Sequence, residues 1–171
     1  LKNKKVTNLN VYTKKLRYPV PLNGLKKLTK NKLINIRRIS KYIVLDFNNS
    51  YTLVIHLGMS GRLRLANNAD LTKHDHIVCK FNKNFYLFFN DPRRFGFIDF
   101  VETSKINELP YIMKLGVDAL DKKLSTNYLY DQIKKTNVLI KQILLNQHIV
   151  CGIGNIYASE ILFDAKISPF R

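Results

Sequence analysis

Cysteine is scarce in this sequence, which has only Cys79 and Cys151 among its 171 residues. The two stand far apart and form no Cys-x-x-Cys pair, so the sequence contains neither a zinc-finger motif nor a disulfide framework. No run of 18 apolar residues is present, which argues against a transmembrane helix, and no apolar stretch follows Leu1–Lys5, so we expect no signal peptide. We therefore expect a cytoplasmic protein in a reducing setting, without a membrane partner.

Acidic residues are also few. Asp and Glu total 12 against 29 Lys and Arg, which gives a formal net charge of +17. Hydrophobic residues make up 46% of the chain, which is too many for a disordered polycation. The length suits one domain, or two small ones, with a buried core.

The positive charge is concentrated in the first 50 residues, which hold 13 Lys and Arg and a single acid, Asp46. Such an excess favours a polyanionic partner, with nucleic acid ahead of an anionic membrane. A compositional origin is the alternative, because Lys outnumbers Arg by 21 to 8 and Asn and Ile are abundant, as in proteins from AT-rich genomes.

The first hundred residues have the pattern of a β-rich domain, since short β-branched or aromatic segments alternate with turn residues. Asn48–Ser50 and Asn82–Asn84 are expected turns. Pro19 and Pro21 predict that the segment around them is a loop or an edge strand. The expected strands are Val6–Val11, Leu33–Ile39, Tyr42–Phe47, Thr52–Leu57, Arg62–Leu65, Ile77–Phe81, Phe85–Phe89 and Phe95–Val101. Strands at this spacing are typical of a sandwich or barrel-like pair of sheets.

The remainder of the chain has helical periodicity. Helices are expected at 126–135, 138–147 and 156–165, with Asn137 as the N-cap of the second, Asn155 opening the last and Pro169 ending it. The predicted fold class is therefore α+β: an antiparallel β-sandwich over 1–103, a linker over 104–125 and an α-helical part over 126–171.

Two turns carry residues suited to contact nucleic acid. In His56–Arg64 a Gly-x-x-Gly turn presents Met59, which is either packing filler or an apolar wedge of the kind inserted between base steps. In Asn90–Gly96 an Asp-Pro turn precedes Arg93, Arg94 and Phe95. This turn is either a solvated tip with Phe95 folded into the core or a probe that uses Arg for phosphate or base edges and Phe for stacking.

Two further motifs are weaker indications of function. His74 and His76 are two residues apart and would point the same way on a strand; with His56 they suggest a metal site without a fourth ligand, or a DNA-contacting surface. Gly152–Glu160 places glycines before a helix N-terminus, which suits either phosphate binding or a tight helix crossing.

Together these motifs resemble bacterial formamidopyrimidine-DNA glycosylase, a bifunctional glycosylase and AP lyase that excises oxidised purines, such as 8-oxoguanine and formamidopyrimidines, from duplex DNA. A sister endonuclease that prefers oxidised pyrimidines fits less well, because it lacks the Met-Ser-Gly and Asp-Pro-Arg-Arg-Phe versions. The resemblance spans nearly the whole chain, over Arg38–Tyr42, His56–Arg64, Lys73–His76, Asp91–Gly96, Leu115-Gly116, Ile140-Lys141, Gly152–Glu160 and Pro169.

The resemblance implies roles for individual residues. Met59, Arg93 and Phe95 correspond to the wedge that fills the space left by a flipped nucleotide, with Arg93 facing the orphaned cytosine. Lys41 corresponds to a lysine that assists proton transfer in β-elimination, and Glu160 to a glutamate of the helix–two-turn–helix motif.

The resemblance also implies DNA contacts. His56 and Asn155 correspond to phosphate clamps beside the lesion, and His74 and Lys141 to other DNA-binding residues. One position departs from the family's pattern of DNA contacts: the family usually has a basic residue where this chain has Asn137.

The larger departures are at the ends. The family begins with a proline whose amine is the nucleophile, followed by a glutamate, and it ends with a Cys₄ zinc finger. Neither is present within Leu1–Arg171, so we expect a monomeric fragment truncated at both ends, with no cofactor of its own and inactive by itself. The alternatives are a non-catalytic DNA-binding remnant and a β-sandwich adaptor whose basic character is compositional.

Overall fold

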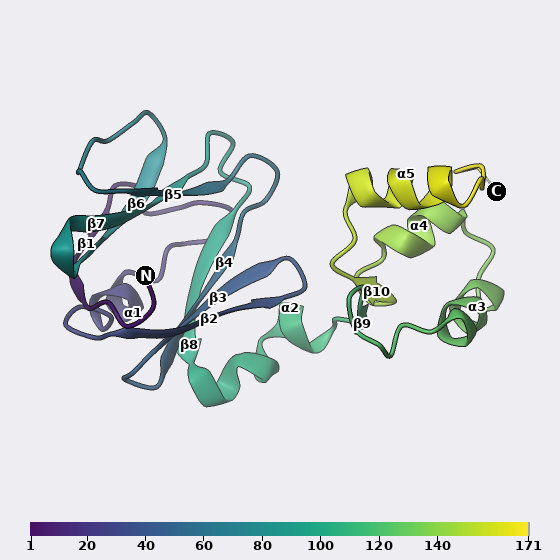
Figure 1. The fold of residues 1–171 in the computed structure, drawn as a ribbon, viewed down its shortest axis with the longest axis horizontal. Helices are drawn as coiled ribbons and strands as arrows, with labels where there is room; N and C mark the ends of the chain where they lie inside the picture. The colour runs from purple at the N-terminus through teal and green to yellow at the C-terminus, as the bar shows by residue number, and fades with distance from the viewer. Residues whose placement is uncertain (171) are drawn as a thin grey trace. The chain divides into compact units, whose positions relative to one another are not determined.

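The structure is a computed structural model that describes residues 1–170 (Figure 1). The chain folds into two compact units. The first comprises Leu1–Arg38 and Tyr42–Ile106, and the second comprises Ile39–Lys41 together with the chain from Asn107 onward. In the described residues no helix is long and apolar enough to cross a membrane.

The first unit contains two four-stranded sheets. One has the strand order β1-β6-β7-β5 and the other β2-β3-β4-β8. In the first sheet β6 pairs antiparallel with β1 and β7, and in the second β4 pairs antiparallel with β3 and β8. The strands are β1 (Val6–Val11), β2 (Leu33–Ile39), β3 (Tyr42–Phe47), β4 (Tyr51–His56), β5 (Arg62–Ala66), β6 (Asp75–Phe81), β7 (Phe85–Asn90) and β8 (Phe97–Glu102). All eight predicted strands are present within two residues of their expected ends, and the α+β class is confirmed.

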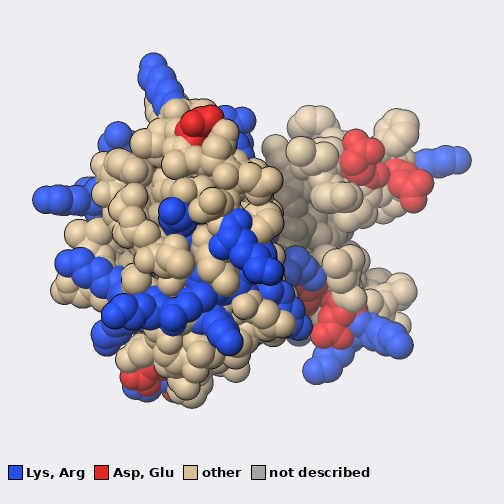
Figure 2. All heavy atoms as spheres, turned by 60° about the vertical axis from the view of Figure 1, so that its left-hand side comes forward, with Lys and Arg blue, Asp and Glu red and all other residues tan. Residues whose placement is uncertain are grey.

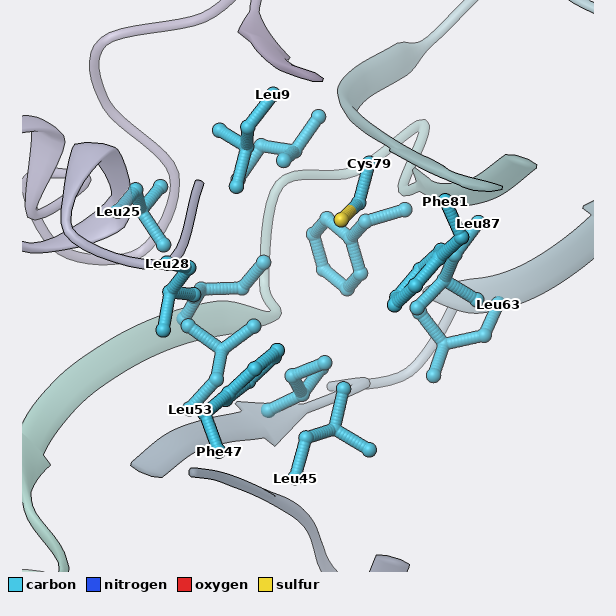
Figure 3. Close-up of a pocket in the computed structure, with 14 residues that line it drawn as sticks. Leu9, Leu25, Leu28, Leu45, Phe47, Leu53, Leu63, Cys79, Phe81 and Leu87 are labelled. Carbon is cyan, nitrogen blue, oxygen red and sulfur yellow. The ribbon is translucent and has the colours of Figure 1, made fainter. Parts of the chain in front are cut away.

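The core of this unit lies between the two sheets. Alternating strand residues bury Leu45 and Leu53 from one sheet and Phe81 and Leu87 from the other, and Figure 3 shows these side chains facing a small apolar space. The helix α1 (Leu22–Lys26) and the residues after it add further leucines to the same cluster. Cys79 lies in this core, and burial raises the pKa of its thiol to about 12, so it acts as a small apolar residue.

The second unit is mostly helical. Its elements are α2 (Pro110–Met113), β9 (Val117–Asp118), α3 (Thr126–Lys134), α4 (Ile140–Leu145), β10 (Val150–Cys151) and α5 (Asn155–Asp164). The two short strands pair in parallel. Ser125 caps α3 by accepting a hydrogen bond from the Tyr128 N–H at 3.1 Å. The helices bury Leu144, Ala158 and Leu162 in a core of their own.

Three details differ from the sequence-based expectation. Asn137 is not a helix cap, because α4 begins at Ile140 with Leu139 as its N-cap. The last helix ends at Asp164, and Lys166 then adopts a left-handed φ of 55°, so the helix stops before it reaches Pro169. The segment expected to be a linker contains the 3₁₀ helix η2 (Thr103–Glu108) as well as α2 and β9.

Candidate functional site

Two connections at one end of the first unit carry the predicted wedge residues. The connection 57–61 leads from β4 in one sheet to β5 in the other, and the connection 91–96 leads back from β7 to β8. His56 pairs with Phe97, and Arg62 pairs with Asn90. Because the strands that flank both connections are paired at these ends, the two turns lie side by side.

Asp91 joins the two turns. Its side chain is fully buried, and Oδ1 accepts a hydrogen bond from Ser60 Oγ at 2.5 Å while Oδ2 accepts one from the Gly96 N–H at 2.7 Å. Ser60 Oγ in turn accepts a hydrogen bond from the Arg93 N–H at 3.2 Å. One carboxylate therefore holds the Met59 turn against the Arg93 turn.

The side chains at the tips of these turns point away from the core. Met59 is 74% exposed and Phe95 is 44% exposed, so neither is packing filler in this unit. The Arg93 guanidinium carbon lies 4.5 Å from the centroid of the Phe95 ring, a cation–π contact that orients both groups. The pair and Met59 together form an exposed, cationic and apolar tip.

Gly58 allows the two turns to approach each other. It has a left-handed φ of 64°, and a Cβ built there would lie 2.6 Å from the Gly96 nitrogen and 2.6 Å from the Phe95 carbonyl carbon. Both neighbours are backbone atoms and can yield only if the turns separate.

We expect Gly58→Ala to lower the free energy of unfolding by about 2 kcal/mol, since a left-handed alanine alone costs about 1–2 kcal/mol. Urea denaturation followed by circular dichroism measures the change. Gly154→Ala is the matched control, because the space there is open apart from Lys41 Nζ at 3.9 Å. Equal stability of wild type and Gly58→Ala would contradict the steric argument.

His56 is held in one orientation at the end of β4. Its ring stacks on Phe97 at 5.5 Å between centroids and lies 5.3 Å from the Tyr42 ring. Its Nδ1 accepts a hydrogen bond from the Gly58 N–H at 3.1 Å. In the neutral ring the proton is therefore on Nε2, which is a donor suited to an anionic oxygen.

The two neighbouring histidines do not form the expected strand pair. His74 precedes β6 and has a left-handed φ of 73°, whereas His76 lies within the strand and is buried. His76 has hydrogen bonds on both ring nitrogens, Nε2 with the Asp91 carbonyl at 2.8 Å and Nδ1 with Thr13 Oγ1 at 2.9 Å. It is a structural residue, and within residues 1–170 no group of three His, Cys, Asp or Glu side chains could hold a metal ion.

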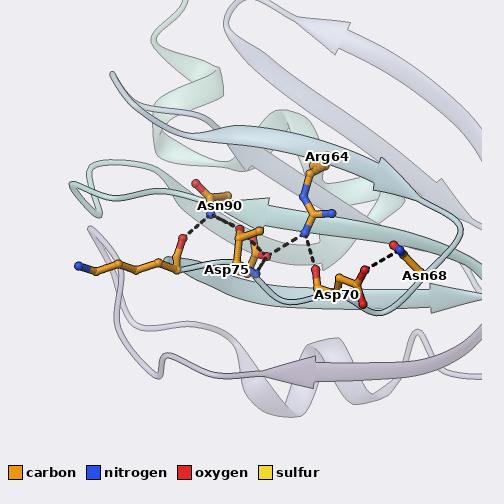
Figure 4. Close-up of polar contacts among 7 residues, drawn as sticks. Arg64, Asn68, Asp70, Asp75 and Asn90 are labelled. Atoms are coloured by element: carbon orange, nitrogen blue, oxygen red, sulfur yellow. Dashed lines mark hydrogen bonds and ion pairs between the residues drawn. The ribbon is translucent and has the colours of Figure 1, made fainter.

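A buried polar network supports the turn that carries His74. The Asp75 carboxylate accepts hydrogen bonds from Arg64 Nη2 at 2.9 Å, from Asn90 Nδ2 at 2.9 Å and from the Thr72 N–H at 2.8 Å (Figure 4). Burial of the carboxylate acts to raise its pKa, but these hydrogen bonds outweigh that effect, and the pKa of Asp75 is lowered. The guanidinium of Arg64 also lies 3.8 Å from the centroid of the Phe88 ring.

The same network positions the backbone near the two turns. Asn90 Nδ2 also donates to the Lys73 carbonyl at 2.9 Å, and the Asp91 N–H donates to the His74 carbonyl at 3.2 Å. The positions of Lys73 and His74 are thus coupled to Asp75 and to the residue that joins the two turns.

Sequence reasoning missed the side chains that hold the site together. Ser60, Asp75, Asn90 and Asp91 lie within or beside the recognised motifs, but nothing in the spacing assigned them a task. One available signal was the scarcity of acids, since Asp75 and Asp91 are two of only 12 in the chain and both occur within these motifs, close to basic residues.

The second unit gathers the other predicted residues. Lys141 Nζ donates to Ser159 Oγ at 3.0 Å, and Ser159 Oγ donates to the Asn155 carbonyl at 3.0 Å, which ties α4 to the first turn of α5. Lys41 lies next to Gly154, and burial lowers the pKa of its ammonium against a smaller opposing effect of Cys151. The side chains of Asn155 and Glu160 are exposed.

Family models match both units. Residues 1–98 match the formamidopyrimidine-DNA glycosylase N-terminal domain, and residues 115–171 match the formamidopyrimidine-DNA glycosylase H2TH domain. A two-sheet unit followed by a helix–two-turn–helix unit defines the class of this protein. The chain belongs to the formamidopyrimidine-DNA glycosylase family, as the motifs indicated.

Individual relatives agree with this assignment. The formamidopyrimidine-DNA glycosylase of Wolbachia pipientis from Culex pipiens is 42% identical over all of this chain and 63% of its own length, and that of Rickettsia bellii is 41% identical over 90% of this chain and 56% of its own. The chain therefore spans about three fifths of the curated relatives that it matches.

Solved structures of the family have the same fold. The Lactococcus lactis enzyme non-covalently bound to DNA with an AP site superposes with a TM-score of 0.90 at 30% identity, covering all of this chain and 66% of that one. A complex of an inhibited form of the Lactococcus lactis enzyme with DNA that contains N7-benzyl-Fapy-dG gives 0.85 at 32% identity, covering 99% and 63%.

Proposed function

We propose that the protein acts in base-excision repair and removes oxidised purines, 8-oxoguanine and formamidopyrimidines, from duplex DNA with associated AP-lyase cleavage. The observation that carries this proposal is the pair of turns joined by Ser60 and Asp91, which presents Met59 beside Arg93 and Phe95. Flipping a nucleotide out of a duplex costs a few kcal/mol of stacking and pairing, and an inserted apolar and cationic wedge offsets part of that cost.

The other residues have roles consistent with a flipped nucleotide. His56, with Nε2 as donor, and His74 contact the DNA backbone on the side of the wedge. In the second unit Lys141 and Asn155 contact phosphate at the start of α5, where the helix N-terminus favours an anion.

Lys41 is the proposed proton-transfer residue. Its lowered pKa brings the ammonium nearer to the range in which a lysine exchanges protons efficiently at neutral pH. Glu160, on the same unit, is a second candidate at an exposed position of α5.

No cofactor is proposed within this chain. Zinc belongs to the family's C-terminal finger, and the cysteines of this chain do not fit it: Cys79 is buried in an apolar core, and neither cysteine belongs to a group of three possible ligands among residues 1–170. The proposed partner is duplex DNA that contains an oxidised purine, bound by a monomer in the cytoplasm.

Borohydride trapping on a duplex with 8-oxoguanine opposite cytosine tests this function. The complete gene product should give a covalent adduct, because borohydride reduces the Schiff base between the enzyme amine and sugar C1′. An in-frame Met-Pro-Glu start upstream of Leu1 would identify that amine. A complete product that neither excises the base nor becomes trapped would refute the proposal.

The 171-residue chain alone separates the two DNA-binding alternatives from the adaptor. Salt-dependent duplex binding without trapping is expected, and it is also the behaviour of a DNA-binding remnant. A covalent adduct with this chain would show that an amine within it, such as that of Lys41 or Leu1, can act as the nucleophile. No binding at low salt would favour an adaptor whose basic character is compositional.

A further inference from the structure

A dense group of lysines lies away from the two turns of the proposed site. The segments 1–5, 26–32 and 80–86 hold nine lysines and no acidic residue. Figure 2 shows Lys and Arg side chains gathered in a band over the first unit, with little acidic surface between them. We call the surface formed by these three segments the lysine surface.

Backbone pairing brings the three segments together. Lys5 forms an isolated antiparallel bridge with Lys32, and the Lys30 N–H donates to the Val6 carbonyl at 2.9 Å. The Asn82 N–H donates to the Lys5 carbonyl at 2.8 Å, and the Lys5 N–H donates to Asn82 Oδ1 at 3.0 Å. Lysines distant in sequence are therefore held within one small region.

The arrangement is electrostatically unfavourable in the free protein. Like charges directly opposite each other on paired strands destabilise the pairing, and Lys5 and Lys32 are such a pair. The carboxylate of Glu102 lies near enough to Lys27 for their charges to interact, but it already pairs with Lys105 at 2.8 Å. A bound polyanion would relieve this repulsion.

The lysine surface lies at the opposite end of the first sheet from the proposed lesion site. The strand β7 begins at Phe85, beside the 3₁₀ turn η1 (Asn82–Asn84), and ends at Asn90, beside the turn that carries Arg93. The length of this strand separates the two ends by about 20 Å. The lysine surface and the two turns are therefore separate surfaces of the first unit.

The chemistry of the surface favours nucleic acid over a membrane. Membrane-surface binding is strongest where basic residues are joined by large apolar side chains that enter the lipid, and none of the large exposed hydrophobic residues lies in these three segments, all of which the structure describes. The lysines are interspersed instead with the asparagines Asn3, Asn82 and Asn84, whose side-chain amides can donate hydrogen bonds to phosphate oxygens. Lys4 Nζ lies 4.1 Å from the centroid of the Phe85 ring, which orders its ammonium.

We propose that the lysine surface binds the phosphate backbone of a second duplex segment, so that one chain holds two segments at once. This goes beyond the proposed excision activity and does not depend on it. Contact with a second segment would let the protein pass between segments during a search for damage, because sequence-independent phosphate contacts supply most non-specific binding.

A bridging experiment tests the proposal with the 171-residue chain. A biotinylated undamaged duplex is fixed to beads, and retention of a free fluorescent duplex is measured with and without protein. The wild-type chain should retain the second duplex. The variant Lys5→Gln/Lys32→Gln/Lys83→Gln should retain at least fivefold less, while still binding the fixed duplex.

Matched variants test whether bridging depends on where the positive charge lies. Lys114→Gln/Lys122→Gln/Lys123→Gln removes the same charge from exposed positions of the second unit and should bridge as wild type does. Lys5→Arg/Lys32→Arg/Lys83→Arg keeps the charge and should also bridge. For the second duplex, the Gln variant should lower the slope of log affinity against log salt by about 2–3, since each phosphate that a lysine no longer neutralises reduces the slope by about 0.9.

Each outcome bears on a specific proposal. No retention by wild type, or equal retention by wild type and the lysine-surface variant, overturns the second binding surface. Loss of binding to vesicles that contain phosphatidylglycerol, with bridging unchanged, assigns the surface to a membrane and also overturns it. Failure of the wild-type chain to bind even the fixed duplex counts against the proposed repair function, whereas failure of bridging alone does not.

Discussion

Replacing Asp75 with alanine should lower the free energy of unfolding by about 3 kcal/mol, the lower part of the range for breaking a buried ion pair. The side chain of Asp75 is fully buried, and its removal leaves Arg64, Asn90 and the Thr72 N–H without their shared acceptor. Arg64 is 30% exposed, so water can hydrate its guanidinium and offset part of the loss in stability. Urea denaturation followed by circular dichroism at pH 7 measures the effect.

Asp70→Ala is the matched control for this prediction. Asp70 is exposed and contacts Arg64 through its backbone carbonyl, which alanine retains, so a change below about 0.5 kcal/mol is expected. The double variant Asp75→Leu/Arg64→Met should recover part of the stability, because it removes both charges at once. Equal losses for Asp75→Ala and Asp70→Ala would show that the network does not stabilise the unit.

The same carboxylate makes stability depend on pH. Since the pKa of Asp75 is lower in the folded than in the unfolded chain, its stabilising contribution is complete above about pH 4, the ordinary range of an aspartate, and is lost as the pH falls through the folded-state value. Thermal unfolding between about pH 2 and pH 5 should therefore vary less in Asp75→Asn than in wild type. If the unfolding temperature changed with pH equally in wild type and Asp75→Asn, a lowered pKa of Asp75 would be contradicted.

Replacing Arg93 or Met59 with alanine in the complete gene product should reduce base excision about 30-fold while undamaged duplex binding falls less than about threefold. In the proposed function both side chains fill the space left by the flipped nucleotide, so their loss should destabilise the flipped state without removing many phosphate contacts. A change of about 30-fold corresponds to about 2 kcal/mol, within the cost of unstacking one step. Single-turnover excision from an 8-oxoguanine duplex and a binding titration on plain duplex measure the two quantities.

Lys105→Ala is the charge control for Arg93→Ala. Lys105 pairs with Glu102 beyond the far end of β8, and its loss removes one positive charge away from the two turns. It should change excision less than about twofold, since exposed ion pairs contribute little. If Arg93→Ala and Met59→Ala reduce excision and plain binding equally, these residues hold phosphate and do not form a wedge.

Some of the fold could be read directly from local chemistry. The pattern of β-branched and aromatic segments separated by turn residues predicted the ends of all eight strands to within two residues. Helix ends were less predictable, because a capping residue such as Asn137 competes with tertiary contacts, and α4 begins three residues later.

The sequence predicted some of the candidate site residues correctly and others not. Met59, Arg93 and Phe95 could be singled out because they occur at glycine- or proline-bearing turns, where such side chains are suited to contact nucleic acid. The expected histidine pair was wrong, because the left-handed backbone at His74 breaks the strand alternation that would have placed it beside His76.

Sequence alone was enough to establish the two-part α+β organisation, the excess of positive charge and the family of the chain, because all three depend on residue type and short-range spacing. Tertiary structure decided which residues act together. The bond from Ser60 to Asp91, the network around Asp75 and the opposition of Lys5 to Lys32 each join segments 11 to 31 positions apart. Such contacts depend on strand register and on the packing of two sheets, and no local pattern encodes either.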